Sequence, residues 1–321
     1  MTGKAKNRQT SSSSYRVTSA SIALILVLSL GTILAGCSIP SSGLTTPTNR
    51  YALLIGVQEY ASVRDLSYPD DDVTDMKAKL EAQGWATATT LVNSEATFAN
   101  IRTQIAALSA DPDATILVYY SGHGHIDVAS GTTYILPYDV TITPDEKLIT
   151  PAMLTTWIAA VPAKHRLLIL DSCFSGGFTL GDGTVDTAQA DYSRMNYQTL
   201  DKGLILGALS KFGSMVANNL STYGDQEVLA LSASGSEEVS WEADSIFHGV
   251  FTYYLLEASD FGDADGDGYV TVNEAYAYTK KEIRENWNID YANSFYPDEW
   301  DFLPHISGGT GDLVLFDNPG P

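Results

Sequence analysis

Two residues of this chain have the types and settings needed to hydrolyse an acyl bond. Cys173 follows the apolar run RLLILD and precedes Phe-Ser-Gly-Gly, which predicts a thiol at the end of a buried strand, beside a sharp turn. His123 lies in YYSGHG, also just past an apolar run, with a glycine on each side. Acyl hydrolysis requires a nucleophile, a base and donors for the developing oxyanion. We therefore expect a His123–Cys173 dyad, with the backbone N–H groups of Gly124 and Cys173 as oxyanion donors.

Each member of this pair also has an ordinary interpretation. Alone, Cys173 fits a buried core thiol and His123 a hydrogen-bonded core histidine. His125 follows the motif closely enough to compete as the base. The other histidines have no comparable setting and are interpreted as surface or packing residues: His165, His248 and His305.

Short apolar runs separated by helical patterns indicate the elements that position these residues. The runs predict buried strands at 51–57, 87–93, 115–122, 166–172 and 227–234. This alternation predicts a three-layer α/β fold with a mainly parallel central sheet flanked by helices. In such sheets the chemistry lies at the carboxyl ends of the strands, where SGHG and DSC are predicted to meet.

Two further segments complete the predicted domain. Residues from about 178 to 225 are rich in Gly, Asp, Ser and Asn and interrupt the alternation, so we expect a long surface insertion there. The run DLVLF, at 312–316, is predicted as a last strand.

Several pieces of the chain, in the same order, resemble the caspase and metacaspase clan of cysteine peptidases. They are YALLIGVQEY, DDVTDM, YYSGHG, YILPYD and LLILDSCFSGG, within residues 51 to about 285. His123 precedes Cys173 by 50 residues, similar to the spacing in caspases, whereas papain-like enzymes place the cysteine first. The resemblance implies a caspase-like fold, peptidase activity on protein or peptide substrates, and a backbone carbonyl that orients the histidine.

The resemblance also implies a specificity. Asp171 lies two residues before Cys173, and alternation along a strand points both residues to the same side. Metacaspases use a matching aspartate, with a second from the acidic turn after the first strand, to receive Arg or Lys before the scissile bond. Asp72 matches that second residue best, although Asp70 and Asp71 leave the register open, and Ser121 adds a hydroxyl. Because a guanidinium can bind a carboxylate bidentately, we expect Arg to be preferred over Lys.

Asp171 has one alternative role. It could merely cap the end of a strand or helix. Animal caspases, which select aspartate, carry glutamine where this chain has Asp171, so the aspartate agrees with a basic preference.

The stretch DADGDGYVTVNE, at 263–274, matches the register of an EF-hand loop. Gly268 occupies the sixth position, where the loop turns sharply. The register predicts oxygen ligands for calcium from six residues: Asp263, Asp265, Asp267, Tyr269, Thr271 and Glu274. A single such loop favours a structural clamp over a paired sensor; the alternative is an acidic surface loop without an ion.

The first residues read as an export signal. Four basic residues and no acid precede the apolar run SIALILVLSLGTILAGCS, which is short for a membrane span. Leu34-Ala35-Gly36-Cys37 resembles the lipobox of bacterial lipoproteins, which implies cleavage before Cys37 and lipidation of its thiol. We thus expect a signal peptide at 1–36, a lipidated flexible tether at 37–49 and a peptidase domain at 50–321. The alternative is an uncleaved anchor helix; both place the body at a membrane, outside the cytoplasm.

The charge of the chain limits its partners. Formal net charge is -21, and loss of the four basic residues of the signal would bring it to -25. Such acidity disfavours nucleic acid and anionic headgroups and favours cations and basic partners. With Cys37 lipidated, Cys173 has no disulfide partner, since the chain has two cysteines.

The leading prediction is a lipid-anchored, calcium-binding cysteine endopeptidase of metacaspase-like type. A second hypothesis is a catalytically silent caspase-like scaffold that binds partners at the cell envelope. A third is related acyl-transfer or amidase chemistry with the same dyad. Thiol labelling separates the scaffold from the enzymes, and only an assay separates the two chemistries.

Overall fold

The computed structural model describes residues 49–127, 130–141, 147–173, 208–223, 227–234, 240–292 and 302–318. The chain divides into two units, Met1–Ser41 and Ser42–Pro321, and every described residue belongs to the second. Cys37 and the predicted signal and tether lie outside the described residues, apart from Asn49 at the tether's end.

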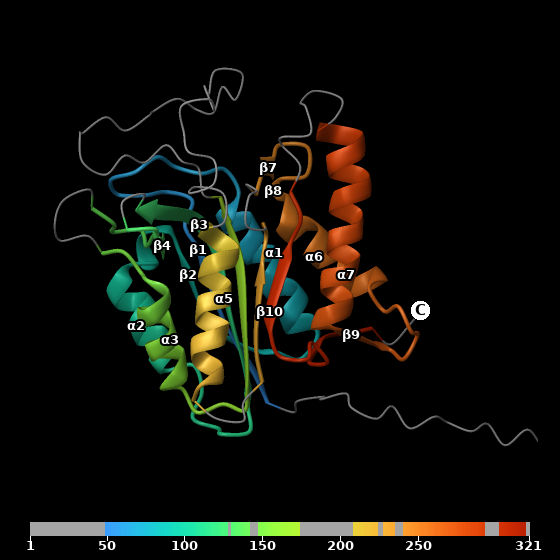
Figure 1. The fold of residues 1–321 in the computed structure, drawn as a ribbon, viewed down its shortest axis with the longest axis horizontal. Coiled ribbons are helices and arrows are strands. Elements are labelled where there is room, and N and C mark those ends of the chain that lie inside the picture. Colours follow the sequence, from blue (N-terminus) through green and yellow to red (C-terminus); the bar gives the residue numbers. More distant parts are fainter. Residues whose placement is uncertain are drawn as a thin grey trace, which may run out of the picture. The chain divides into compact units, whose positions relative to one another are not determined.

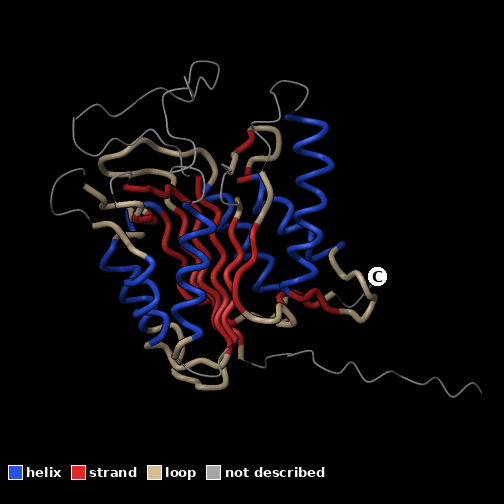
Figure 2. The backbone as a smooth tube through the Cα atoms, viewed as in Figure 1, coloured by secondary structure: helices blue, strands red, loops and turns tan. Residues whose placement is uncertain are grey.

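A central sheet of seven strands organises the domain (Figures 1 and 2). Its strands are β1 (Arg50–Gly56), β2 (Ala86–Val92), β3 (Thr115–Asp127), β4 (Thr132–Ile135), β5 (His165–Cys173), β6 (Glu227–Ser232) and β10 (His305–Gly308). Their order is β10-β6-β5-β3-β1-β2, with β4 paired to β3. The pairs among β1, β2, β3, β5 and β6 are parallel, whereas β10 and β4 are antiparallel to their partners.

The parallel strands β1, β3, β5 and β6 contain continuous apolar runs, as expected where both faces of a sheet are covered. Two small antiparallel ribbons flank it: β7 (Glu242–Ala243) with β8 (His248–Gly249), and β9 (Tyr269–Thr271) with β11 (Val314–Asp317). The helices are α1 (Pro69–Ala82), α2 (Phe98–Ala106), α3 (Pro151–Ala159), α5 (Ala208–Ser221), α6 (Val250–Phe261) and α7 (Val272–Glu282). A 3₁₀ turn, η1 (Asn93–Glu95), precedes α2, and α7 continues into a π-helix, η2 (Ile283–Ala292).

Helices cover the sheet on both sides, which makes three layers. Figure 1 shows α2, α3 and α5 on one face and α1, α6 and α7 on the other. Local sequence explains several helix starts: Thr97 and Thr150 accept hydrogen bonds from backbone N–H groups of the first turns of α2 and α3, and Pro69 opens α1. The architecture confirms the predicted three-layer α/β class with its mainly parallel central sheet.

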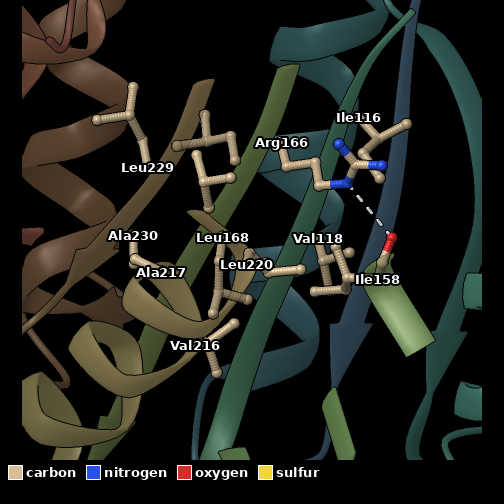
Figure 3. Close-up of a pocket in the computed structure, with 12 residues that line it drawn as sticks. Ile116, Val118, Ile158, Arg166, Leu168, Val216, Ala217, Leu220, Leu229 and Ala230 are labelled. Atoms are coloured by element: carbon tan, nitrogen blue, oxygen red, sulfur yellow. Dashed lines mark hydrogen bonds between the residues drawn. The ribbon is translucent and has the colours of Figure 1, made fainter. Parts of the chain in front are cut away.

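The gap drawn in Figure 3 is part of the hydrophobic core. It lies between α3, α5 and the amino-terminal halves of β3, β5 and β6, and it has no room for a water molecule. Buried Arg166 borders it and donates to the carbonyls of Ile158, Val161 and Ala163. These hydrogen bonds satisfy carbonyl groups at the end of α3 and in the turn that follows it. This end of the sheet is opposite to the strand ends that carry His123 and Cys173.

Two sequence predictions need correction, and a third is confirmed. The predicted insertion at 178–225 is wrong in its last part, because 208–221 form α5, whose Phe212, Val216 and Leu220 are buried against the sheet. The run predicted as a last strand is confirmed, since it forms β11, which pairs with β9 outside the central sheet. The strand predicted at 115–122 continues to Asp127, because its end pairs with β4.

Candidate active site

His123 and Cys173 occupy matching positions on adjacent strands. β3 and β5 pair in parallel, and their register places His123 directly opposite Cys173, the last residue of β5. Neighbouring strands lie about 4.8 Å apart, so the two backbones are close without any loop rearrangement. The structure thereby brings the two predicted dyad residues together at one strand end.

A backbone carbonyl orients the imidazole. His123 Nε2 lies 2.8 Å from the carbonyl oxygen of Arg64, in the segment between β1 and α1. A carbonyl oxygen can only accept, so this contact assigns the proton to Nε2 and makes Nδ1 the basic nitrogen. Burial lowers the pKa of His123 to about 4, and the residue is 3% exposed. At neutral pH the ring is therefore neutral, the form that a general base requires.

Two tyrosines hold the backbone of His123. Tyr60 Oη accepts its N–H at 2.6 Å, and Tyr120 Oη donates to its carbonyl at 2.7 Å. Both hydroxyls pack against Gly122, where an added Cβ would lie 2.6 Å from Tyr120 Oη and 2.8 Å from Tyr60 Oη. A side chain at this position would displace the hydroxyls that fix the histidine. The glycine before His123 thus permits a close approach.

Gly124 and His125, which follow His123 along β3, lie opposite residues of β4. Gly124, the predicted oxyanion donor, lies opposite Ile135 where β4 begins to pair with β3. His125 is opposite Tyr134 and its ring stacks on that tyrosine, with centroids 6.0 Å apart. Since the β3–β5 register ends at the His123–Cys173 pair, the geometry favours His123 over His125 as the base.

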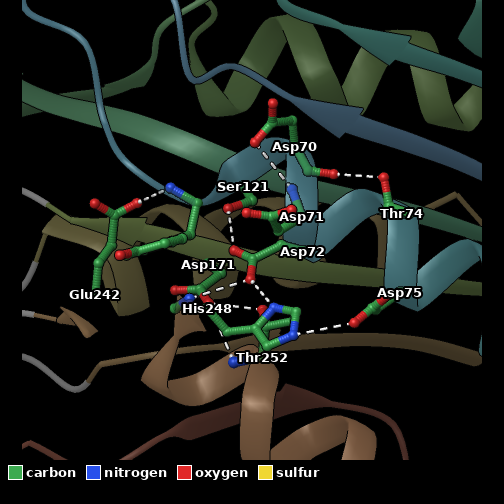
Figure 4. A network of polar contacts seen from close by, with 12 residues as sticks. Asp70, Asp71, Asp72, Thr74, Asp75, Ser121, Asp171, Glu242, His248 and Thr252 are labelled. Carbon is green, nitrogen blue, oxygen red and sulfur yellow. Dashed lines mark hydrogen bonds and ion pairs between the residues drawn. The ribbon is translucent and has the colours of Figure 1, made fainter. Parts of the chain in front are cut away.

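The predicted substrate-binding residues also come together, two positions before the dyad. Ser121 is directly opposite Asp171 in the β3–β5 register. Ser121 Oγ donates to Asp72 Oδ2 at 2.8 Å, which brings in the first turn of α1 (Figure 4). Of the three consecutive aspartates, Asp72 is the buried one that contacts Ser121, whereas Asp70 and Asp71 are more exposed. Asp72 and Asp171 are called the acidic pair below.

The acidic pair is buried, and the pKa values of both carboxyl groups are raised. Asp72 is 1% exposed and Asp171 4%. Burial, followed by the charge of Asp72, raises the pKa of Asp171 to about 7. Burial also raises the pKa of Asp72, although hydrogen bonds from His248 and Ser121 oppose the rise. Two buried carboxylates close together favour an arriving cation, which relieves both the burial and the mutual repulsion.

A family model described as a caspase domain matches residues 49–286. The chain belongs to this caspase-domain family. Its fold is similar to that of a Geobacter sulfurreducens protein, at 18% identity over 84% of this chain and 97% of the other, with a TM-score of 0.52. It is also similar to caspase-1 from Spodoptera frugiperda, at 14% identity over 87% and 99%, with the same TM-score. No curated protein matches this chain.

Sequence reasoning missed most of the partners of the acidic pair in this caspase domain. Asp171 Oδ2 accepts from Thr252 N at 3.2 Å and Thr252 Oγ1 at 2.7 Å, and its Oδ1 accepts from Ser240 Oγ at 3.1 Å. Thr252 is in the first turn of α6, so Asp171 does cap a helix, as the alternative interpretation held. Each carboxylate oxygen has two lone pairs; Oδ2 accepts two hydrogen bonds and Oδ1 accepts one, so capping through Oδ2 and binding of a cation at Oδ1 are compatible.

The β7–β8 hairpin supplies further partners. His248, interpreted from sequence as a surface or packing residue, places Nδ1 2.9 Å from Asp72 Oδ1, and Gly249 N donates to the same oxygen. Glu242, on the other strand, accepts from the backbone N–H groups of Ser67 and Tyr68. The hairpin therefore contacts both the acidic pair and the segment that carries Arg64.

The predicted calcium loop connects α6 to α7 in the caspase domain. One carboxylate oxygen from each of Asp263, Asp265 and Asp267 lies within 4.8 Å of the others. Glu274 accepts from Ala264 N across the loop and from Thr271 N, so its carboxylate also lies over the loop. Gly268 has a φ of +89°, which favours glycine. Tyr269 and Thr271 belong to β9, which pairs with β11.

Within the described residues, no helix has the length and hydrophobicity to cross a membrane.

Proposed function

We propose that this caspase-domain protein is an active cysteine endopeptidase that cleaves after Arg, and less well after Lys, with His123 and Cys173 as its dyad. One observation carries the proposal: two consecutive same-face positions of the β3–β5 register are filled by Ser121 opposite Asp171 and by His123 opposite Cys173. A carboxylate for a basic side chain and the machinery for cleavage are therefore separated by one strand repeat.

The proposed reaction begins with the Cys173 thiol. Its sulfur attacks the carbonyl carbon before the scissile bond while its proton passes to Nδ1 of His123, and the Arg64 carbonyl holds the Nε2 proton. The N–H groups of Gly124 and Cys173 are proposed to stabilise the oxyanion. Collapse breaks the C–N bond, and the amine leaves with the proton from His123. Water then attacks the thioester and gives a proton to His123. Collapse breaks the C–S bond and releases the carboxylic product, and His123 returns the proton to the Cys173 thiolate.

The basic preference rests on the charge of the acidic pair. A guanidinium entering beside Asp171 and Asp72 replaces a repulsive arrangement by two attractive ones. A neutral side chain of the same shape gains hydrogen bonds but no charge neutralisation.

Calcium is proposed to bind the 263–274 loop. Asp263, Asp265, Asp267 and Glu274 would supply carboxylate oxygens, and Tyr269 and Thr271 the remaining protein oxygens. The convergence of the three aspartates supports this fit. The pKa of Asp267 is also raised, by partial desolvation and by the charges of Asp265, Asp263 and Glu274, although the hydrogen bond from the backbone N–H of Tyr269 opposes the rise. Because the loop joins α6 to α7 and β9 pairs with β11, the ion would act as a structural clamp. It would hold α6, whose first turn contacts Asp171.

The remaining part of the proposal concerns location. The lipobox-like stretch ending at Cys37 supports a bacterial lipoprotein held at a membrane outside the cytoplasm, with a peptide or protein as the substrate. The acidic charge supports the absence of nucleic-acid partners.

The test uses full-length protein in mild detergent and four peptides that differ only before the reporter: Arg, citrulline, Lys and Asp. Citrulline is the matched control, since it retains the shape of Arg without its charge. We expect cleavage after Arg, then Lys, with little after citrulline, and no cleavage by Cys173→Ala or His123→Ala. Asp171→Asn should remove the advantage of Arg over citrulline. Equal rates for Arg and citrulline would reject the specificity, whereas no hydrolysis and no thiol labelling would indicate the scaffold.

A further inference from the structure

His248 bridges two carboxylates at the edge of the acidic pair. Its Nδ1 lies 2.9 Å from Asp72 Oδ1, and its Nε2 lies 3.2 Å from Asp75 Oδ2 (Figure 4). A neutral imidazole has one N–H and one lone pair, so it can donate to only one of these carboxylates. Two carboxylates at the two ring nitrogens therefore favour the protonated ring, a positive charge already beside Asp72.

Groups from three elements surround this imidazole. α1 supplies Asp72 and Asp75, with Asp71 exposed beside them. The ring of Tyr253, in α6, has its centroid 6.3 Å from that of His248. From the sheet, Asp171 approaches the adjacent Gly249, where an added Cβ would lie 3.2 Å from Asp72 Oδ2 and closer still to Asp171. Within the hairpin, Glu242 pairs with Gly249 across β7–β8.

We propose that His248 is a specificity-determining residue: a built-in counter-ion that competes with the basic side chain of the substrate for Asp72. The inference rests on the proposed preference for Arg and Lys and goes beyond it by naming what opposes that preference. Asp72 Oδ1 already accepts from His248 Nδ1 and Gly249 N, and Oδ2 accepts from Ser121. An arriving guanidinium must therefore share this carboxylate with a like charge.

The competition gives substrate selection a pH dependence. Burial alone would lower the pKa of His248, but the hydrogen bond to Asp72 and the charges of Asp72 and Asp75 outweigh burial and raise it. As pH rises through that raised value, the imidazolium loses its charge and Arg should bind more tightly. Asp171 ionises near pH 7 and acts in the same direction, so a pH profile of the wild type cannot separate the two groups.

Asp75 separates them by the sign of its effect. Its side chain is 58% exposed and contacts His248 on the nitrogen remote from Asp72. Without competition, Asp75→Asn removes a negative charge near a cation-binding pocket and should weaken binding of Arg slightly. With competition, it makes His248 easier to deprotonate and should strengthen binding. The two ideas therefore predict opposite changes.

The experiment measures binding, so that ionisation of the dyad does not contribute. Full-length Cys173→Ala protein in mild detergent is titrated with a fluorescent Arg peptide and its citrulline analogue from pH 5.5 to 8.5. In that background we compare His248→Gln, Asp75→Asn, their combination, and Asp260→Asn. Asp260 is the matched control, because it is 60% exposed and pairs with Lys79 on another part of α1.

We expect three results at pH 6. His248→Gln should bind the Arg peptide at least about tenfold more tightly, because a nearby positive charge is gone. Asp75→Asn should tighten binding by about 1.5-fold to 5-fold, the range that an exposed ion pair supports. The Asp75→Asn gain should vanish when His248→Gln is present. The differences among the variants should shrink as pH rises through the raised pKa of His248, and the citrulline peptide should show none of these changes.

Each failure has its own meaning. If Arg binds no better than citrulline in any variant, the proposed basic specificity is wrong. If Arg is preferred but Asp75→Asn weakens binding or behaves like Asp260→Asn, His248 is only a hydrogen-bond donor that positions Asp72, and the inference is overturned. Asp75→Asn changes an exposed residue, so its effect on binding remains decisive even if His248→Gln fails to fold.

Discussion

Replacing Asp171 by Asn should stabilise the fold at alkaline pH while it removes the preference for Arg. In the native state Asp171 has a pKa of about 7, raised by burial and then by Asp72, against 3.8 in an unfolded chain. Between these values the folded state binds more protons than the unfolded state. The contribution of this group is thus complete below about pH 4 and is lost as pH rises through about 7. Asn cannot ionise and avoids the loss.

The magnitude follows from the pKa difference. The difference between a pKa of about 7 in the native state and 3.8 in the unfolded chain, at about 1.36 kcal/mol per pKa unit, gives about 4 kcal/mol at full ionisation. This is an upper limit, because the ionisation of Asp72 and His248 depends on the charge of Asp171 and changes when that charge is removed. A gain of about 1 kcal/mol at pH 8 is the smallest that supports the reasoning, and it corresponds to about 2–4 °C in melting temperature.

Urea denaturation at pH 4.5 and pH 8 measures the effect as a difference between variant and wild type. The difference is required because His123 has the opposite dependence: its native pKa of about 4 lies below 6.5, so its contribution is lost as pH falls from 6.5 towards 4. Both proteins retain His123, so this contribution cancels. Asp260→Asn serves as an exposed control without a pH-dependent gain. A destabilisation by Asp171→Asn of equal size at both pH values would show that capping of α6, not charge burial, dominates.

Three further predictions concern other parts of the chain. Tyr60→Phe leaves the buried N–H of His123 without its acceptor, so it should lower the free energy of unfolding by about 1–3 kcal/mol. It should also lower kcat more than it changes KM. Tyr223→Phe, at an exposed site, is the control and should do neither. Millimolar calcium should raise the melting temperature, and Glu274→Gln should reduce that rise. If calcium does not shift the melting temperature of the wild type, the proposed metal site is wrong. Cys37→Ala should abolish acyl labelling and release the protein from membranes, and unchanged retention without labelling in the wild type would favour the uncleaved helix.

Much of the fold could be predicted because β1, β3, β5 and β6 contain apolar runs that are bounded by turns and separated by helical patterns. α5 was missed because Gly213, Asn218 and Asn219 concealed the four-residue spacing of its buried residues. β10 was missed because HISG has no apolar run, and only its pairing with β6 makes it a strand. These elements depend on tertiary contacts more than on local composition.

The candidate site was predictable where a side chain carries the chemistry. The resemblance already favoured Asp72, and helical spacing could have settled its register, because Asp72 lies four residues before buried Met76 and therefore on the inner side of α1. The carbonyl of Arg64 could not be found, since every residue has one and only the fold brings this one to His123. His248 gave no signal because its partner, Asp72, is distant in sequence.

The short β7–β8 hairpin links the proposed specificity pocket and the proposed base into one mechanical unit. One strand carries His248 against Asp72, and the other carries Glu242, which fixes the N–H groups of Ser67 and Tyr68 in the segment that presents the Arg64 carbonyl to His123. Substitutions that shift this hairpin will change selectivity and turnover together. Laboratory evolution of a new specificity should therefore proceed through positions on the rigid strands, such as Ser121, and mutations in the hairpin should trade rate against selectivity.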